Sequence, residues 1–256
     1  MGKIIAIANQ KGGVGKTTSA VNIAAGLGIC EKNTLLIDID PQGNATSGVG
    51  IDKRSIPVSA YDVLINGVLA NEAVFQTVYP RLDILPSSLD LAAADLALAD
   101  MPNREFILKN AVSTVRGYYD YIIIDCPPSL GLVTINALSL ADTVLVPIQC
   151  EFYALEGLSQ LMSTVRIVKR KYNPLLDIEG VLLTMYDGRL NLTQQVVEEV
   201  KKFFPKKVFS TVIPRSVRIS EAPSHGKPIM YYDRTNKGSD AYMALANEII
   251  RRNKVN

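Results

Sequence analysis

Two lysines, three glycines and two threonines fall within one short stretch, Lys11–Thr18. The stretch follows an apolar run at residues 4–8 and opens an Ala-rich segment that we expect to be a helix. Small residues let the backbone curl around a polyphosphate, where Lys16 can reach the β- and γ-phosphates and the Thr17 hydroxyl can bind Mg²⁺. The pattern therefore predicts a site for a nucleoside triphosphate. The expected phosphate-binding residues are Lys11, Gly12, Gly13, Val14, Gly15, Lys16, Thr17 and Thr18.

Three aspartates are candidates to complete this site. Asp38 and Asp40 follow one apolar run, on a turn that a proline and a glycine enforce, and Asp125 ends another run at residues 120–125. An aspartate at a strand end beside a phosphate loop is the expected partner of Mg²⁺, usually through water. We expect this role for Asp125 and Asp38, and we expect Asp40 to position an attacking water. A turn or a helix cap is the alternative role at these positions.

Hydrolysis of a phosphoanhydride is the chemistry that such residues can support. It needs mainly charge stabilisation and an aligned water, which Lys11, Lys16, Mg²⁺ and Asp40 can supply. The only histidine, His225, lies in a predicted turn, so acid–base catalysis by histidine is not expected. The three cysteines are widely spaced without a C-x-x-C pair, which argues against a zinc or iron–sulfur centre.

Apolar runs indicate the elements that position these residues. Runs rich in Ile, Val and Leu predict buried strands at residues 4–8, 34–38, 82–85, 120–125, 143–148, 178–184 and 208–212. Helical spacing predicts helices at 89–100, 154–172, 193–204 and 240–252. This alternation predicts one α/β domain over residues 1–256, of the doubly wound P-loop NTPase type, with a mostly parallel sheet and helices on both faces. Ligands of such sheets lie beyond the carboxyl ends of the strands.

Composition sets the class of protein. With 48% hydrophobic and 20% charged residues, the chain has the composition of a folded soluble protein. No apolar run approaches the roughly 18–20 residues that span a bilayer. Residues 1–3 lead directly into the first predicted strand, so we expect no signal peptide and a cytosolic location.

Charge is divided unevenly along the chain. Residues 1–164 hold 10 Lys and Arg against 16 Asp and Glu, whereas residues 165–256 hold 17 against 9. The asymmetry suggests an acidic partner, most simply nucleic acid, for the second part, and a solvated basic face is the alternative. The basic C-terminal segment 240–252 is compatible with a membrane surface, but we expect its Ala-rich apolar face to dock on the core.

Several long motifs, in order along the chain, resemble those of the ParA/Soj chromosome-partition ATPases. The loop has Gln10 where the general G-x-x-x-x-G-K-[ST] pattern has glycine, and it adds Lys11, like the deviant Walker A motif of the ParA/MinD group. The likeness covers almost the whole chain. The other motifs lie at residues 38–47, 125–131, 154–158, 214–218 and 221–223.

The resemblance implies an ATPase cycle. ATP binding forms a sandwich homodimer, the dimer binds double-stranded DNA of the nucleoid without sequence preference, and a ParB-type centromere-binding protein triggers the hydrolysis that releases DNA. It also implies that Lys11 contacts nucleotide across the dimer and that Asp40 supports hydrolysis. The base would be bound by Met185, Pro214 and Arg215. The candidate DNA-binding residues are Arg189 and Arg218, at positions implicated in the family, and Lys201, Lys202, Lys206 and Lys207 in the basic part of the chain.

Two other functions share parts of this pattern. A MinD-like positioning ATPase has the same kind of loop but relies on a C-terminal membrane helix. A nucleotide-dependent regulatory adaptor would instead bind another protein, such as a replication initiator, and use slow hydrolysis as a timer. Because the chain starts at the first predicted strand, we expect no N-terminal helix-turn-helix domain and no sequence-specific operator binding.

Overall fold

One seven-stranded sheet organises the computed structural model, which describes residues 2–151 and 154–254. The side chains of residues 154–157 lie outside this description, and so does most of the motif at 154–158. The strand order is β3-β4-β2-β5-β1-β6-β7, and all neighbours are parallel except β3 and β4. The mostly parallel sheet predicted from the sequence is confirmed. The strands are β1 (Lys3–Ile7), β2 (Thr34–Asp38), β3 (Phe75–Gln76), β4 (Leu82–Leu85), β5 (Tyr121–Asp125), β6 (Thr143–Gln149) and β7 (Asp177–Thr184).

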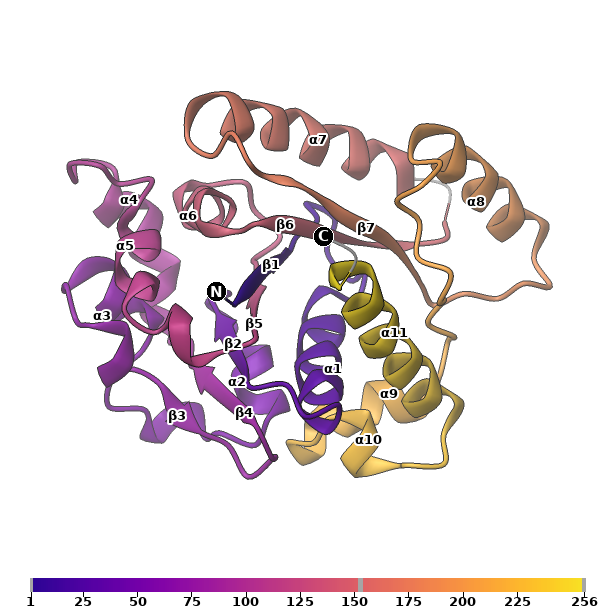
Figure 1. The fold of residues 1–256 in the computed structure, drawn as a ribbon, viewed down its shortest axis with the longest axis horizontal. Coiled ribbons are helices and arrows are strands. Elements are labelled where there is room, and N and C mark those ends of the chain that lie inside the picture. The colour runs from indigo at the N-terminus through magenta and orange to yellow at the C-terminus, as the bar shows by residue number, and fades with distance from the viewer. Residues whose placement is uncertain (1, 152–153, 255–256) are drawn as a thin grey trace.

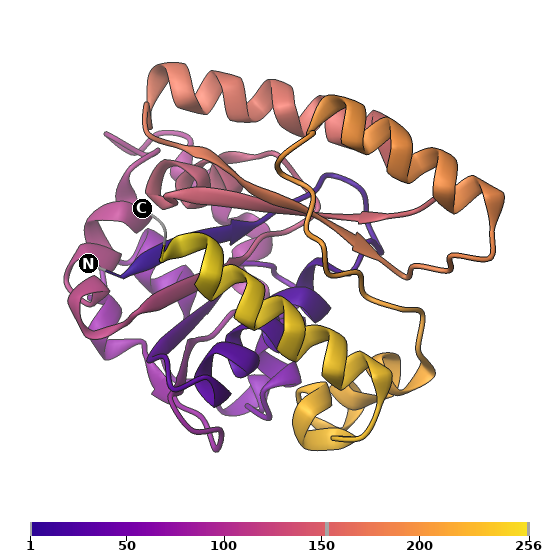
Figure 2. The same ribbon diagram turned by 45° about the vertical axis from the view of Figure 1, so that its right-hand side comes forward.

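Helices cover both faces of the sheet because its central strands are apolar on both sides. In β1, Ile4 and Ala6 pack into one core, and Ile5 and Ile7 pack into the other. Figures 1 and 2 show α1 and α11 side by side on one face, with α6 and α7 on the opposite face. The helices of the first face are α1 (Lys16–Ile29), α2 (Asn44–Gly48), α9 (Val217–Glu221), α10 (Ile229–Tyr232) and α11 (Lys237–Asn253). Those of the second are α3 (Ala60–Ile65), α4 (Ala94–Leu98), α5 (Ile107–Ser113), α6 (Leu132–Leu140), α7 (Ala154–Lys171) and α8 (Asn191–Phe203).

The prediction of a strand at residues 208–212 is wrong. This segment is extended and runs beside β7, where the Val181 N–H donates to the Lys207 carbonyl at 2.8 Å and the Phe209 N–H donates to the Val181 carbonyl at 3.0 Å. The ladder stops there because the next two N–H groups, those of Ser210 and Thr211, donate to the side chain of Glu248. Glu248 thus takes the Thr211 N–H, the next donor that a continuous strand would offer to β7, and pairing with β7 returns only at the Ile213 N–H.

The helices predicted at residues 89–100 and 240–252 differ in how closely the structure matches the prediction. The segment 89–100 begins as a 3₁₀ helix, Leu89–Ala93, without a side-chain hydrogen bond at its N-cap, and only then becomes α4. The C-terminal helix α11 docks on the core as expected, with Tyr242, Leu245 and Ile249 fully buried on the α1 face. None of the helices in the described part of the chain combines the length and apolar character needed to cross a bilayer.

Candidate nucleotide-binding site

The loop between β1 and α1 presents backbone N–H groups at the carboxyl edge of the sheet. Gly13 and Gly15 have φ angles of 73° and 85°, in the left-handed region that favours glycine. Gly15 is the N-cap of α1, and its first turn (from Lys16) contains neither an acidic residue nor a side-chain cap. The first N–H groups of α1 are therefore available to an anion, as the sequence pattern predicted.

Side chains outside the glycine-rich motif hold this loop in place. Asn9 donates to the Pro147 carbonyl at 2.8 Å and accepts the Lys11 N–H at 3.0 Å. Thr184, at the end of β7, donates its hydroxyl to the Val14 carbonyl at 2.8 Å. Local sequence patterns do not predict the bonds of Asn9 to Pro147 and of Thr184 to Val14, since each joins residues more than a hundred positions apart.

Lys16 folds back over the loop rather than pointing into solvent. It is only 6% exposed, and its ammonium group donates to the Lys11 carbonyl at 3.1 Å. Burial lowers the pKa of Lys16, and the negative charge of Asp125 opposes that change. The cation therefore already lies beside the phosphate loop and near the carboxylate predicted to bind Mg²⁺.

Asp125 ends β5 beside Asp38 of β2 and Ile7 of β1. Both of its carboxylate oxygens are buried, and neither has a partner with full hydrogen-bond geometry among the described residues, although the Thr17 hydroxyl lies near enough to lower the pKa of Asp125. Burial, followed by the charge of Asp38, raises the pKa of Asp125 well above its usual range, whereas Thr17 and Lys16 act in the opposite direction. A buried carboxylate without partners is costly unless a cation binds it. Asp125 and the Thr17 hydroxyl therefore fit Mg²⁺, which usually takes few protein ligands and keeps several waters.

Asp38 and Asp40 have different surroundings from Asp125. One oxygen of Asp38 accepts both the N–H and the hydroxyl of Thr46 at 2.7 Å, and the other accepts the Asp40 N–H at 3.2 Å. Asp38 is fully buried, and burial raises its pKa to about 6. These contacts favour the turn role over the metal role for Asp38. Asp40 accepts the Gln42 N–H at 2.9 Å, is 8% exposed, and is tied through its carbonyl to the Ser87 hydroxyl.

A cavity of about 160 Å³ adjoins the loop on the side of α11. It brings the predicted base-binding residues Met185, Pro214 and Arg215 together with Gly15 and Thr18 of the loop. Sequence reasoning missed the contributions of Thr184 and of α11. The cavity is lined by Gly15, Thr18, Thr184, Met185, Ile213, Pro214, Arg215, Ser216, Ile219, Ser220 and Tyr242.

Lys11, the second lysine of the motif, does not point at its own loop. Its ammonium group lies 3.7 Å from the carboxylate of Glu151, which follows β6, and the two side chains are 31% and 50% exposed. Such a half-exposed ion pair is weak. Glu151 therefore holds Lys11 at the surface of the site through a weak ion pair that can easily break.

The cations predicted to bind DNA all fall within residues 189–218, and most are paired. Arg189 donates two hydrogen bonds to Asp187, at 2.8 and 2.6 Å, and these bonds lower the pKa of Asp187 to about 2. Arg218 lies 3.0 Å from Glu221. Within the lysine cluster (Lys201, Lys202, Lys206 and Lys207), Lys202 pairs with Glu199 and Lys207 with Asp177. Lys201 and Lys206 are exposed and form no ion pair within the described part of the chain.

Comparisons with known proteins agree with this geometry. A family model described as an AAA domain matches residues 2–178. The chain is 57% identical over 249 residues to the sporulation initiation inhibitor protein Soj of Bacillus subtilis, covering 97% of this chain and 98% of that protein. It is 53% identical over 252 residues to the chromosome partitioning protein ParA of Myxococcus xanthus, covering 98% and 89%.

A solved structure has the same fold. Cobyrinic acid a,c-diamide synthase from Mycobacterium smegmatis, with bound ATP analog and magnesium, has a TM-score of 0.87 and 36% identity, and the match covers 99% of this chain and 96% of that one. The fold matches over nearly its whole length, and the two partition proteins match over nearly the whole sequence. The chain therefore belongs to the AAA-domain family and, within it, to the ParA/Soj chromosome-partition ATPases.

Proposed function

We propose that this protein binds ATP with Mg²⁺, forms an ATP-dependent homodimer that binds DNA without sequence preference, and releases DNA when a ParB-type partner stimulates slow hydrolysis. The observation that carries the proposal is the meeting, at one edge of the sheet, of three features. These are the glycine-rich loop, a buried carboxylate without partners at Asp125, and the cavity that contains Met185, Pro214 and Arg215.

Each residue has a role that follows from its place. The N–H groups of Gly13, Gly15 and the first turn of α1 bind phosphate oxygens, and Lys16 adds a positive charge where the β- and γ-phosphates lie. Thr17 and Asp125 would hold Mg²⁺, and the cation would neutralise charge on the phosphates. Asp40 orients the attacking water at the edge of the site. The products are ADP and phosphate.

Dimerisation uses Lys11, which leaves Glu151 to contact the phosphates of the partner subunit. The cost is small because the ion pair is long, at 3.7 Å, and half-exposed. A second subunit in contact with the nucleotide adds charge to the site only in the ATP state. The stability of the homodimer therefore depends on which nucleotide is bound.

DNA binding rests on the charge of the second part of the chain, and above all on Lys201 and Lys206. The ion pairs of Arg189, Lys202, Lys207 and Arg218 are exposed, so phosphates of DNA can replace their carboxylate partners at little cost. Contact with about 6 phosphates predicts that log K falls with log[salt] at a slope near −5.

Binding to an arbitrary DNA duplex tests the proposal. Fluorescence anisotropy is measured with ATP, with ADP and without nucleotide over a salt series, and the Asp40→Ala variant is used to hold the triphosphate state. We expect binding only with ATP, with the steep salt dependence given above. A control variant, Lys16→Ala, removes the charge at the phosphates and is expected to abolish the ATP dependence.

The alternatives give other results. If DNA is bound equally in every nucleotide state, or in none, the nucleotide-gated switch is wrong. Co-sedimentation with liposomes only in the ATP state supports the MinD-like function, although α11 buries its apolar face in the core. Failure of every condition, including added partner, to produce turnover favours the adaptor that acts on a replication initiator.

A further inference from the structure

A single carboxylate of the C-terminal helix fixes the segment between the cavity and the lysine cluster. Glu248 of α11 is 4% exposed and accepts two hydrogen bonds from each of two adjacent residues, Ser210 and Thr211. Ser210 donates its N–H at 2.9 Å and its hydroxyl at 2.8 Å to one oxygen, and Thr211 donates its N–H at 2.9 Å and its hydroxyl at 2.7 Å to the other. Both oxygens of Glu248 are thus bonded twice to adjacent residues, and charged acceptors make the stronger hydrogen bonds.

The residues that Glu248 holds belong to the connecting segment, which we define as residues 208–213. It begins directly after Lys206 and Lys207 and ends at Pro214 and Arg215, which line the cavity. Backbone bonds attach it to β7 at both ends: Phe209 N–H to the Val181 carbonyl at 3.0 Å, and Ile213 N–H to the Leu183 carbonyl at 2.9 Å. Glu248 supplies the attachment between those two points, where the sheet supplies none.

A second side chain of α11 reinforces this attachment. Arg252 donates to the Val208 carbonyl at 2.8 Å and to Glu248 at 2.7 Å, and its guanidinium lies 4.1 Å from the centre of the Phe209 ring. One turn or more before Glu248, Tyr242 of the same helix lines the cavity. Helix α11 therefore contacts the cavity wall with one residue and the connecting segment with two others.

We propose that Glu248 is a positioning residue, whose hold on the connecting segment makes the shape of the base-side cavity and the placement of the lysine cluster depend on each other. The proposal rests on the proposed function, because the two sites that it couples are the nucleotide site and the DNA-binding lysines. Nucleotide contact with Pro214 and Arg215 displaces the connecting segment as one body, since the carboxylate fixes its middle. Without that bond the two ends move independently.

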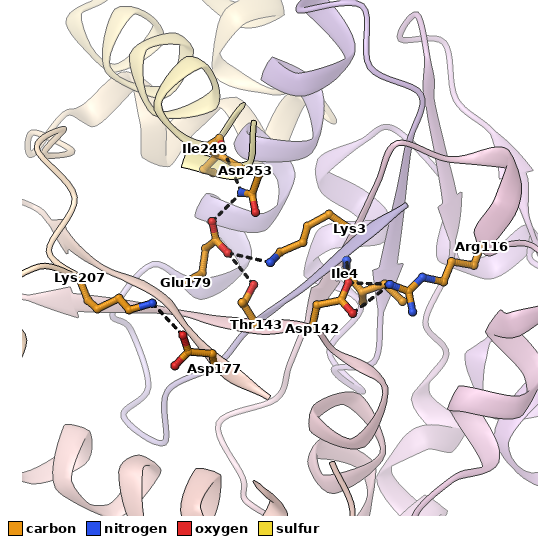
Figure 3. A network of polar contacts seen from close by, with 10 residues as sticks. All are labelled: Lys3, Ile4, Arg116, Asp142, Thr143, Asp177, Glu179, Lys207, Ile249 and Asn253. Atoms are coloured by element: carbon orange, nitrogen blue, oxygen red, sulfur yellow. Dashed lines mark hydrogen bonds and ion pairs between the residues drawn. The ribbon is translucent and has the colours of Figure 1, made fainter. Parts of the chain in front are cut away.

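The alternative is that Glu248 only stabilises the fold, and the chain contains a matched control. Glu179 of β7 is also buried, at 7% exposure, and it too binds α11. It accepts the Thr143 hydroxyl at 2.6 Å and the Asn253 amide at 2.7 Å, with Lys3 at 3.5 Å (Figure 3). Lys3 and Thr143 begin β1 and β6, Glu179 lies near the start of β7, and none of the three lines the cavity. Both glutamates fasten the same helix, but only Glu248 touches the connecting segment.

The test compares Glu248→Gln with Glu179→Gln. Each change keeps the size of the side chain, removes its charge and leaves buried donors unmatched, so both lower the melting temperature, Glu248→Gln by more because it has more hydrogen bonds to lose. Affinity for a fluorescent ATP analogue and for an arbitrary DNA duplex is then measured with ATP and with ADP. We expect the ratio of DNA affinities between the ATP and ADP states to fall about tenfold in Glu248→Gln and to stay unchanged in Glu179→Gln, within the usual range of coupling between two sites.

The nucleotide measurement separates failure of this proposal from failure of the proposed function. If the parent protein binds no DNA, the proposed function is wrong, but Glu248→Gln still weakens the ATP analogue about fivefold if the connecting segment positions Pro214 and Arg215. Equal effects in the two variants, or none in either, overturn the positioning role.

A milder change covers the case in which Glu248→Gln does not fold. Thr211→Val keeps the shape of the side chain and removes only the hydroxyl bond of 2.7 Å to Glu248. It is expected to reduce the ATP-to-ADP ratio and the affinity for the ATP analogue by about two- to threefold each, while Thr143→Val, which removes the corresponding bond to Glu179, leaves both unchanged. Unchanged values in Thr211→Val overturn the proposal.

Discussion

Carboxylates at the two edges of the sheet differ in how they are bonded. At the amino edge, Asp142 accepts the Ile4 N–H at 2.8 Å and two bonds from Arg116, and Glu179 is bonded on both oxygens (Figure 3). At the carboxyl edge, both oxygens of Asp125 lack a partner among the described residues. The amino-edge carboxylates have partners that stabilise the fold, whereas Asp125 stays unmatched beside Asp38, which Thr46 satisfies, and the proposed Mg²⁺ site requires such an unmatched carboxylate.

The largest effect is expected from Asp125→Asn, which tests the difference between the two edges of the sheet. We expect ATP turnover to fall by about 10²- to 10³-fold, because a carboxylate that holds the charge-neutralising cation is lost. The melting temperature without nucleotide should stay the same or rise, because the change removes a buried charge that has no partner. Phosphate release and thermal unfolding measure the two effects. A clear fall in melting temperature with turnover intact would mean that Asp125 is structural.

Lys11→Ala tests the same edge at the subunit contact. The variant should bind nucleotide nearly as well as the parent, because Lys11 points to Glu151 rather than into its own loop. Its ATP-dependent dimer should weaken by about tenfold or more, since a charge-assisted contact to phosphate is lost. Light scattering with ATP gives the dimer fraction, and a fluorescent ATP analogue checks the nucleotide affinity. An unchanged dimer fraction would contradict the proposed role.

Asp142→Asn should have the opposite effects to Asp125→Asn, lowering stability and leaving turnover unchanged. The amide keeps one acceptor for the Ile4 N–H but loses the charge that Arg116 binds with two bonds. We expect a loss of about 1–3 kcal/mol in the free energy of unfolding. Turnover per folded molecule should not change, since the residue lies at the amino edge. Urea unfolding and phosphate release give the two quantities, and reduced turnover in folded protein would break the comparison between the edges.

Sequence reasoning located the elements of this site because each is local. The glycine-rich loop and the strand that precedes it are continuous stretches, so spacing alone indicates their structure. Asp38 and Asp125, however, follow the same pattern at the ends of neighbouring strands. Only the structure shows that Thr46 donates two hydrogen bonds to Asp38. The two aspartates therefore differ in a contact with Thr46, eight residues further along the chain, which Asp38 makes and Asp125 lacks.

The failure at residues 208–212 has the same origin. The segment has the apolar composition of a buried strand, but Glu248, far along the chain, takes the N–H groups of Ser210 and Thr211. Asn9 and Thr184 were likewise missed because their partners are distant in sequence. Local patterns thus predicted the ligand-binding motifs, whereas the long-range hydrogen bonds that fix their positions left no sequence signal.

The pH dependence of the free energy of unfolding tests the hydrogen bonds of Glu248. Burial by itself raises the pKa of this carboxyl, but its hydrogen bonds to Ser210 and Thr211 together bring the pKa down to about 2, below the ordinary value of 4.5. A depressed pKa means that the bonds stabilise the fold above the ordinary value and that this contribution is lost as the pH falls toward 2. Urea unfolding should show the parent about 1–2 kcal/mol more stable than Glu248→Gln at pH 6. The difference should shrink between pH 4.5 and pH 3, and a constant gap would refute this account.

The smallest expected effect concerns the ion pair between Lys11 and Glu151. If this pair holds Lys11 away from a partner subunit, Glu151→Gln releases the lysine and should strengthen the ATP-dependent dimer, the opposite sign to Lys11→Ala. Half-exposed pairs are worth about 0.5 kcal/mol, so the dissociation constant should fall only two- to threefold. Salt screens the pair in the parent, so the advantage of the variant should shrink as ionic strength rises. A weaker dimer in Glu151→Gln would instead assign Glu151 to the subunit contact itself, and sedimentation with ATP at two salt concentrations distinguishes the two roles.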